Sequence, residues 1–405
     1  MTPALAELLR LLEARRDEVE EWLAAEFAKQ LLPFYCSVDV RVSDHKIAPI
    51  DTNLFPGGFN NLAAADQKRA GEAAKELLAR QYPAARRALL ITEAHTRNPY
   101  YAEHLAVLRG VLEAAGLEAR LAFASGEATT LRGHHAEVEL VAIERQGARL
   151  VAGDFEPDLV ILNADQSGGT PEILAGLEQP VIPPPRAGWA HRRKSAHFFQ
   201  YERVAARFAR AFGFDPWLVT SYFNVCSRVD VSRNIGLECL ARVLEDTLAD
   251  IAAKYAELGV ADRPFAVLKA DAGTYGMGVL MADDPAQVRS LNRRQRGSLS
   301  SVKDGAAVND ILVQEGIPTA DRVEGLVAEP VRYMVGAAVA GGFWRLNQAK
   351  SERENLNSRG MLFWPMPYQA PAGRPAAYAT DVVARLALLA TTRELADELA
   401  RSGGG

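Results

Sequence analysis

The sequence has few cysteines and no long apolar run. Its three cysteines, Cys36, Cys226 and Cys239, form no C-x-x-C pair, which argues against a disulfide framework and a zinc site. Apolar runs such as 88–92 and 159–162 fall far short of the roughly 20 residues that cross a bilayer, so we expect no membrane partner. The N-terminus is acidic and lacks an apolar core with a cleavage site, which predicts a cytoplasmic protein without a signal peptide.

The sequence also lacks an excess of positive charge. It carries 46 Lys and Arg against 51 Asp and Glu, so its net charge is -5 and we expect no nucleic-acid partner. Hydrophobic residues make up 48% and charged residues 24%, which excludes the disordered and fibrous classes. A chain of 405 residues exceeds one ordinary core, so the length predicts two or three lobes.

The first half of the chain shows the periodicity of an α/β layer. Leucines at helical spacing predict one long amphipathic helix over 5–27. Strands and helices then alternate, which is typical of a parallel sheet covered by helices. The predicted strands are 37–43, 47–52, 88–93, 118–123 and 159–163, the predicted helices are 62–81 and 100–115, and a hairpin is predicted over 137–151.

A proline cluster at 180–185 marks a boundary, because proline cannot continue a helix or a central strand. The elements beyond it indicate a mixed α+β nucleotide lobe. They are the helices 190–212 and 235–258 and the strands 265–270, 310–315, 327–339 and 343–348. We therefore divide the chain into an N-terminal segment with a metal and substrate motif (1–85), an α/β substrate-binding lobe (86–189) and a nucleotide-binding lobe (190–400).

A lysine at the end of a buried strand precedes a glycine-rich loop. The strand ends in Lys269, and Gly273, Gly276 and Gly278 follow. Such glycines let backbone N–H groups approach phosphate oxygens while the ammonium supplies positive charge, so the pattern suits a polyphosphate. The spacing matches neither the Walker loop nor the Rossmann fingerprint. A glycine-rich hairpin with a solvated lysine would give the same pattern, and both interpretations stay open.

Two short polar pairs are further candidates. Gln314 and Glu315 end a strand, where an amide and an acid can receive an adenine amine and a ribose, although polar strand ends are common. Asp51 and Asn53 are two apart in an extended segment, so their oxygens face one side and could share a hard cation such as Mg²⁺. The alternative for the second pair is an Asx-type turn in which both side chains bond local backbone.

The segment 345–360 crowds basic side chains, Asn355 and Asn357 around a turn that ends on glycine. It could close on substrate carboxylates or phosphates, or it could be an ordinary solvated loop. A serine hydrolase has no support, because the G-x-S-x-G motif is absent.

Together these segments resemble the ATP-grasp ligases, in which a lysine-bearing strand, a glycine-rich loop and a Gln-Glu strand end surround ATP. The order of the motifs is similar to the permuted order of eukaryotic glutathione synthetase. From about Leu5 to Glu398 the chain is more specifically similar to a proteobacterial family of glutamate–cysteine ligases. The segments 43–61, 269–278 and 352–360 carry this resemblance.

The resemblance implies a fold with α/β and α+β lobes and a definite reaction. The expected enzyme is an ATP-dependent ligase that joins glutamate and cysteine into γ-glutamylcysteine through γ-glutamyl phosphate, the first step of glutathione biosynthesis. ATP is the co-substrate and Mg²⁺ the expected metal, with Mn²⁺ as the alternative. The oligomeric state stays open, with a homo-oligomer as one candidate. A glutathione synthetase or another carboxylate–amine ligase is the rival enzyme, and a nucleotide-binding regulator is the rival without catalysis.

The resemblance also implies roles for residues. The metal ligands are Asp51 and Asn53, with Asp271 as the nearest substitute for a loop glutamate of the family, where this chain has Gly273. The catalytic residues are Lys269, which neutralises phosphate, and Arg345, which stabilises the acyl phosphate. The expected ATP contacts are Lys194, Lys269, Gly273, Thr274, Tyr275, Gly276, Gly278, Gln314 and Glu315. The expected substrate contacts are Asn60, Asn61, Arg345, Asn355, Asn357 and Arg359, and the loops 273–278 and 352–360 are the expected lids.

Overall fold

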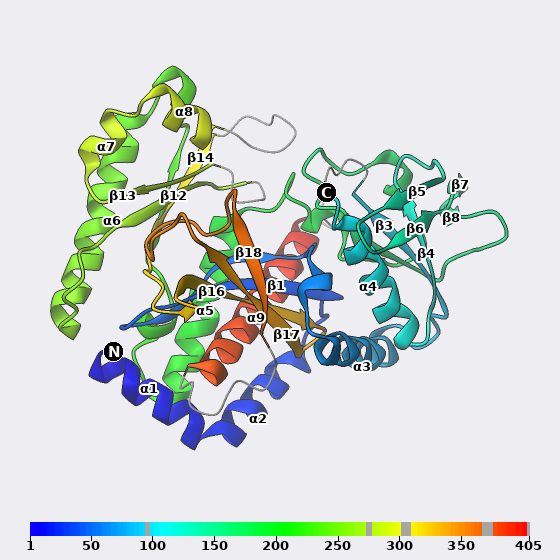
Figure 1. Cartoon of the computed structure of the whole chain (residues 1–405), viewed down its shortest axis with the longest axis horizontal. Helices are drawn as coiled ribbons and strands as arrows, with labels where there is room; N and C mark the ends of the chain where they lie inside the picture. The colour runs from blue at the N-terminus through cyan, green and yellow to red at the C-terminus, as the bar shows by residue number, and fades with distance from the viewer. Residues whose placement is uncertain (94–97, 273–277, 301–308, 367–375, 403–405) are drawn as a thin grey trace.

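The computed structural model describes residues 1–93, 98–272, 278–300, 309–366 and 376–402 (Figure 1). Within this part of the chain the strands form a six-stranded sheet, two four-stranded sheets and two short two-stranded sheets. Helices and strands mix throughout, so the predicted mixed α/β class is confirmed. None of the helices in these ranges carries an apolar stretch long enough to cross a membrane.

The six-stranded central sheet joins the two ends of the chain. Its order is β18-β17-β16-β1-β2, with β15 beside β16, and all these pairs are antiparallel. Asp39 of β1 faces Asp51 of β2, and Asp39 also faces Val331 of β16. The N-terminal metal motif therefore lies beside strands from the far end of the sequence. The strands are β1 (Tyr35–Val42), β2 (Ile47–Asn53), β15 (Arg322–Val323), β16 (Leu326–Val335), β17 (Ala338–Asn347) and β18 (Met361–Met366).

The predicted boundary between β16 and β17 was wrong. The sequence predicted a strand over 327–339, but β16 ends at Val335 and β17 already begins at Ala338. Gly336 between them has a φ of 54°, in the left-handed region that glycine adopts without strain. The chain therefore reverses there in a tight turn, inside a run of apolar residues that looked continuous in the sequence.

Helix α9 (Ala377–Ser402) forms an inner layer against β1, β2 and β16. Its residues 382–384 and 386–390 are fully buried, because α5 (Lys194–Phe212), α1 (Pro3–Ala14) and α2 (Arg16–Phe27) also contact it. The charged residues Asp381 and Arg385 of this helix are paired, with Arg332 and Glu20 respectively, so the helix can lie in the interior.

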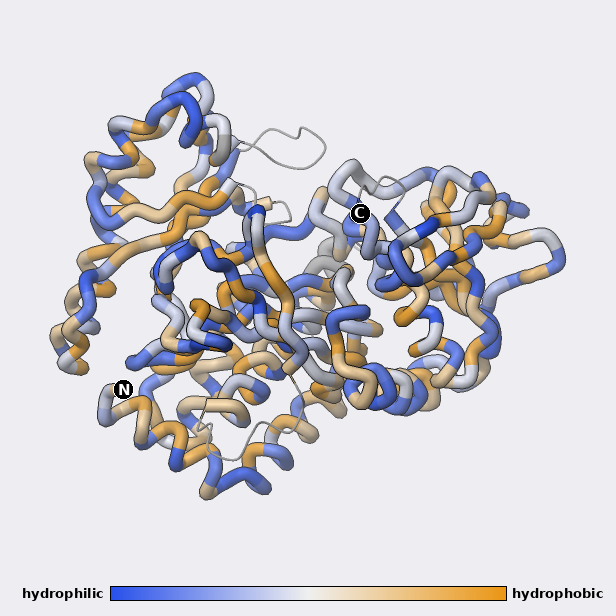
Figure 2. Tube along the Cα trace, viewed as in Figure 1, coloured by the Kyte–Doolittle hydropathy of each residue, from blue (hydrophilic) through white to orange (hydrophobic). Residues whose placement is uncertain are grey.

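The predicted single N-terminal helix was wrong, because Arg15 leaves the helical conformation with φ -110° and ψ 29° and separates α1 from α2. Thr2 caps α1 by accepting from the backbone N–H of Leu5. Orange and blue alternate along both helices in Figure 2, which fits the predicted amphipathic pattern.

The predicted parallel layer is confirmed. Its order is β10-β9-β3-β4 and all its pairs are parallel, with α3 and α4 in contact with each other beside it. The hairpin predicted over 137–151 is confirmed in its second part, where β7 pairs with β8, whereas β6 pairs with the preceding β5. The elements are η1 (Phe59–Asn61), α3 (Ala64–Gln81), β3 (Arg87–Thr92), α4 (Tyr101–Ala114), β4 (Glu118–Phe123), β5 (Thr129–Arg132), β6 (Glu137–Leu140), β7 (Glu144–Gln146), β8 (Arg149–Val151), β9 (Leu159–Asn163), η2 (Glu172–Leu174), β10 (Val181–Ile182) and η3 (Pro185–Ala187).

The second four-stranded sheet is antiparallel, in the order β11-β14-β12-β13, and has its own apolar core. The three cysteines are free, as predicted, although the Sγ atoms of Cys226 and Cys239 lie 3.2 Å apart between β11 and α6. The elements are η4 (Pro216–Val219), β11 (Phe223–Ser227), η5 (Val231–Arg233), α6 (Leu237–Leu258), β12 (Ala266–Ala270), β13 (Val279–Ala282), α7 (Pro285–Arg289), α8 (Arg293–Leu299) and β14 (Asp310–Glu315).

A buried ionic cluster fastens α9 to the segment before α5 and to β2. The Arg192 guanidinium donates to both oxygens of Glu394, at 2.8 and 3.0 Å, and to the carbonyl oxygen of Thr52 at 2.6 Å. His197 lies 3.2 Å from Glu394. Burial opposes ionisation of Glu394, but the charge of Arg192 outweighs it and lowers the pKa of Glu394 to about 2. The carboxylate is therefore ionised whenever the protein is near neutral pH.

We predict that Glu394→Ala destabilises the fold by about 3–5 kcal/mol, because Arg192 is then left buried without its counter-charge. The folded state lowers the pKa of Glu394 from 4.5 to about 2, so its stabilisation is present above about pH 4.5 and is lost as the pH falls toward 2. Urea unfolding of wild type and variant measures this at a series of pH values from neutral down to about 2. The difference between their free energies of unfolding should become smaller as the pH falls. Glu238→Ala, which breaks an exposed ion pair with Arg289, should leave the free energy of unfolding nearly unchanged.

Candidate active site

An open cavity of about 790 Å³ lies between the central sheet and the second antiparallel sheet. Its walls come from β1 and β2 on one side and from β12, β13 and β14 on the other. One part of the lining is apolar and the other is charged, as a nucleotide requires for its base and its phosphates. The apolar lining consists of Phe265, Val267, Val279, Met281 and Ile317, and the charged lining includes Asp39, Arg41, Asp51, Lys194, Lys269 and Glu329.

Lys269 projects into the cavity from β12. Its Nζ donates to the carbonyl oxygen of Ile50 and to Oε1 of Gln314, each at 2.8 Å. Gln314 in turn donates from Nε2 to the hydroxyl of Ser221 at 2.8 Å, so its amide is held from both ends. Burial lowers the pKa of Lys269 to about 8, against the attraction of Asp51. The structure thus makes Gln314 an orienting partner of Lys269 rather than a free group waiting for adenine.

Asp51 and Lys194 form an ion pair at 2.6 Å across the charged part of the cavity. Lys194 is the first residue of α5 and its Nζ stands 4.3 Å from the centre of the Trp189 ring. Burial opposes the charge of Asp51, but Lys194 and Lys269 outweigh it and lower the pKa of Asp51 to about 2. The structure therefore gathers the two predicted lysines around one ionised carboxylate.

Asn53 and Asp271, the other predicted metal ligands, have local partners. Oδ1 of Asn53 accepts from the backbone N–H of Phe55 at 2.9 Å, which is the Asx-type turn that the sequence left open. The two oxygens of Asp271 accept from the backbone N–H and the hydroxyl of Ser195, at 2.8 and 2.7 Å, and cap the start of α5. Among the residues described, no three His, Cys, Asp or Glu side chains are grouped to hold a metal.

The donor set nevertheless fits a sparsely held divalent cation. Asp51 supplies an ionised carboxylate at the cavity, and Asn53 keeps a second lone pair on the oxygen that closes its turn. Mg²⁺ commonly takes one or two protein oxygens and completes its shell with phosphate and water. Asp51 is therefore the residue best placed to hold the metal, with Asn53 beside it.

Glu315 leaves one buried oxygen for a ligand. Its Oε2 accepts from Nζ of Lys46 at 2.7 Å and from the backbone N–H of Tyr222 at 2.9 Å. Its Oε1 has no hydrogen-bond partner within the described part of the chain, although the residue is only 1% exposed and lines the cavity. A buried acceptor without a donor costs free energy unless a ligand supplies one. This oxygen could accept from the amino group of a base, and the adenine contact expected at the Gln-Glu strand end stays a prediction.

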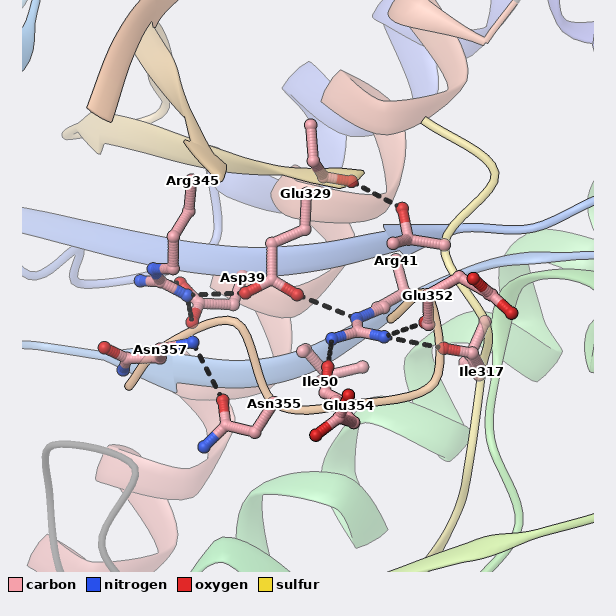
Figure 3. Close-up of polar contacts among 12 residues, drawn as sticks. Asp39, Arg41, Ile50, Ile317, Glu329, Arg345, Glu352, Glu354, Asn355 and Asn357 are labelled. Atoms are coloured by element: carbon pink, nitrogen blue, oxygen red, sulfur yellow. Dashed lines mark hydrogen bonds and ion pairs between the residues drawn. The ribbon is translucent and has the colours of Figure 1, made fainter. Parts of the chain in front are cut away.

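Arg345 lies behind the cavity lining and holds two acidic side chains that do line it. Its Nη1 donates to Asp39 at 2.5 Å and to Glu329 at 2.9 Å, and Glu329 also accepts from Nε of Arg41 at 2.7 Å (Figure 3). Burial raises the pKa of Asp39, against the charge of Arg345. Sequence reasoning missed Asp39, Arg41 and Glu329. The available signal was a charge inside an otherwise apolar strand, at 39 and 41 in β1 and at 329 in β16.

The remaining predicted residues divide into three groups. Asn355 and Asn357 line the cavity, as expected of substrate contacts. Asn60, Asn61 and the exposed Arg359 are not among the lining residues. Gly278 is described and has a φ of 69°, whereas Gly273, Thr274, Tyr275 and Gly276 lie outside the described residues, as does the lid expected there.

The sequence also matches a family model. The model of glutamate–cysteine ligase matches residues 10–395. The chain belongs to the glutamate–cysteine ligase family. The predicted family and activity are thereby confirmed: the protein is an ATP-dependent ligase, and its family uses ATP with a divalent metal.

Solved structures give the same picture. A protein from Methylobacillus flagellatus KT, named as a candidate gamma-glutamylcysteine synthetase, is 42% identical to this chain, with a TM-score of 0.90 over 98% of this chain and 97% of that one. A glutathione synthetase-like effector from Globodera pallida is 10% identical over 90% of this chain and 85% of that one, with a TM-score of 0.41. A search of curated proteins gives no match.

We predict that the metal requirement of this ligase separates Asp51 from Asp271. Asp271→Asn keeps an oxygen for the Ser195 N–H and should leave the dependence of ADP release on Mg²⁺ concentration within about twofold of wild type. Asp51→Asn removes the carboxylate charge and should raise the Mg²⁺ concentration required by more than about tenfold. A larger increase in the required Mg²⁺ concentration for Asp271→Asn than for Asp51→Asn would show that Asp271, and not Asp51, is the metal ligand.

Proposed function

We propose that this ligase activates the γ-carboxylate of glutamate as γ-glutamyl phosphate in the cavity between the two sheets. The observation that carries the proposal is the convergence of Lys194 and Lys269 on Asp51 beside an apolar slot. A carboxylate oxygen of glutamate attacks the γ-phosphorus of ATP and ADP leaves. The amine of cysteine then attacks the acyl carbon, phosphate leaves, and γ-glutamylcysteine is formed.

The apolar part of the cavity suits the adenine of ATP, as in the ATP-grasp ligases that the motifs resemble. Phe265 and Met281 line it, and Oε1 of Glu315 offers an acceptor to the exocyclic amine. Lys46 pairs with the other oxygen of Glu315 and holds that carboxylate in place. The preference for an amine over a carbonyl at that position would favour ATP over GTP.

The charged part suits the phosphates and the reacting carboxylate. Lys269 is held at 2.8 Å by Gln314, so its ammonium is positioned before ATP arrives. Phosphoryl transfer asks a protein mainly for alignment and charge neutralisation, and the two lysines that line the cavity supply both. Asp51, with Asn53, would hold Mg²⁺, which supplies further neutralisation of the phosphate oxygens. A covalent nucleophile is not required by this route.

The test is ADP release by the purified protein with Mg²⁺ and ATP, combined with mass detection of the product. We expect ADP release only when glutamate and cysteine are both present, with γ-glutamylcysteine as the product. ADP release only with γ-glutamylcysteine and glycine would instead indicate that the protein is a glutathione synthetase. Nucleotide binding without turnover in either mixture would contradict the proposal.

The low pKa of Lys269 generates a pH prediction. Because the ammonium attracts phosphate only when protonated, and its pKa in the free protein is about 8, ATP affinity should be constant below pH 8 and fall as the pH rises beyond it. Lys269→Arg keeps its charge and should remove this break from the profile. Calorimetric titration with ATP and Mg²⁺ across the range measures both. A break that persists in Lys269→Arg would assign it to another group.

A further inference from the structure

Arg41, for which the sequence predicted no role, donates hydrogen bonds to several walls of the cavity. Its Nε donates to Glu329 at 2.7 Å. Its Nη1 donates to the carbonyl oxygens of Ile317 and Glu352, at 3.2 and 2.7 Å, and its Nη2 donates to the carbonyl oxygen of Glu354 at 2.7 Å. Four N–H groups of one guanidinium are thus engaged, and the residue is only 4% exposed (Figure 3).

These acceptors belong to three different parts of the fold. Glu329 lies in β16 of the central sheet, beside the strand of Arg41 itself. Ile317 follows β14 of the second sheet, just beyond Gln314 and Glu315. Glu352 and Glu354 belong to the segment 350–357, which we call the cover loop. Arg41 therefore connects both sheets of the cavity with the loop that lies over it.

The cover loop supplies lining residues to both parts of the cavity. Arg353, Asn355 and Asn357 all line it. The guanidinium of Arg353 stands 4.3 Å from the centre of the Phe265 ring in the apolar part. The carbonyl oxygen of Glu352 also accepts from the backbone N–H of Thr319 at 2.9 Å. The backbone of the cover loop is thus bonded to both sheets, and the expectation that 352–360 acts as a lid that orders with nucleotide stays a prediction.

Only an arginine can make this set of bonds. A guanidinium offers five N–H donors in a rigid plane, whereas a lysine ammonium offers three donors on one atom and cannot reach separated acceptors in the same way. The charge is also balanced locally, because Glu329 pairs with Arg41 and Arg345, and Asp39 pairs with Arg345. The network can therefore stay buried without a ligand.

We propose that Arg41 is a positioning residue that holds the cover loop over the substrate cavity before ATP and glutamate bind. It acts through the backbone of Glu352 and Glu354 and touches no reacting atom. The inference rests on the proposed function for the identity of the ligands. The placement of the loop itself can be measured without any turnover.

Loss of this role should appear as weaker binding and not as slower chemistry. A fixed wall contacts the bound substrates equally in the ground state and the transition state, so loosening it removes uniform binding. We expect Arg41→Met to raise the KM for ATP by about tenfold while kcat changes by less than about threefold.

The matched control is Arg332→Met. Arg332 is a buried arginine in β16 that pairs with Asp381 at 2.6 Å and does not line the cavity. Arg332→Met loses a buried ion pair, as Arg41→Met does. It should therefore lower the midpoint of thermal unfolding by a similar amount but leave the KM for ATP unchanged. Arg41→Lys is the second variant, since it keeps a charge beside Glu329 but cannot serve Glu352 and Glu354 together.

Limited trypsin cleavage after Lys350 and Arg353, without ligands, measures the loop directly. Cleavage there should be at least about tenfold faster in Arg41→Met than in wild type, faster also in Arg41→Lys, and unchanged in Arg332→Met. ATP with Mg²⁺ should restore protection to the Arg41 variants. Unchanged cleavage and unchanged KM in both Arg41 variants would overturn the proposal. Faster cleavage in a protein that lacks turnover with glutamate and cysteine would support the role of Arg41 and contradict the proposed function.

Discussion

Charge buried between two sheets is costly unless each charge has a partner, and this constraint organises the cavity. A single ion moved into a protein interior loses several kcal/mol of hydration, which only close opposite charges and hydrogen bonds return. The Asp51–Lys194 pair, the Glu315–Lys46 pair and the network around Arg345 satisfy that requirement from different elements. The charged groups that line the cavity are therefore held in place by the same contacts that let the sheets approach each other.

The same constraint fixes the walls of the cavity. Lys269 is pinned by Gln314 and Ile50, and the segment over the cavity is pinned by Arg41. Charges fixed in this way need not be reorganised during a reaction, which is the condition under which they stabilise a transition state most. One acceptor, Oε1 of Glu315, is left for a ligand to satisfy.

The sequence predicted the secondary-structure elements and the reaction better than it predicted which side chains pair with each other. Alternation and helical spacing placed most strands and helices, because each depends on the local pattern of burial. The sequence did not predict the break at Arg15, because the helical spacing of apolar residues continues past it, nor the turn at Gly336, which lies inside an apolar run. Lys194, Lys269 and Asp51 were found because they stand in motifs. Asp39, Arg41 and Glu329 were not, because their significance comes from pairing with residues far away in the sequence.

The roles of Asp271 and Gln314 show the same limit. Asp271 precedes the glycine-rich loop and Gln314 lies near the end of β14, so the sequence favoured a ligand for each. In the structure Asp271 accepts from the backbone N–H of Ser195 at the start of α5, and Gln314 accepts from the ammonium of Lys269. A residue type indicates what a side chain can bind, whereas the competing acceptors and donors around it decide what it does bind.

The pairing of β1 with β16 has a consequence for how the protein is made. Arg41 and Glu329, which meet across these strands, are 288 positions apart in the sequence. When a ribosome has synthesised the first half of the chain, β1 and β2 have no neighbour on the β16 side, and an unpaired strand edge invites association with other chains. Contacts of such high separation also slow folding, since the intervening chain must be ordered first. The central sheet can therefore close only near the end of translation, and shortened chains that stop before β16 should expose the edge of β1.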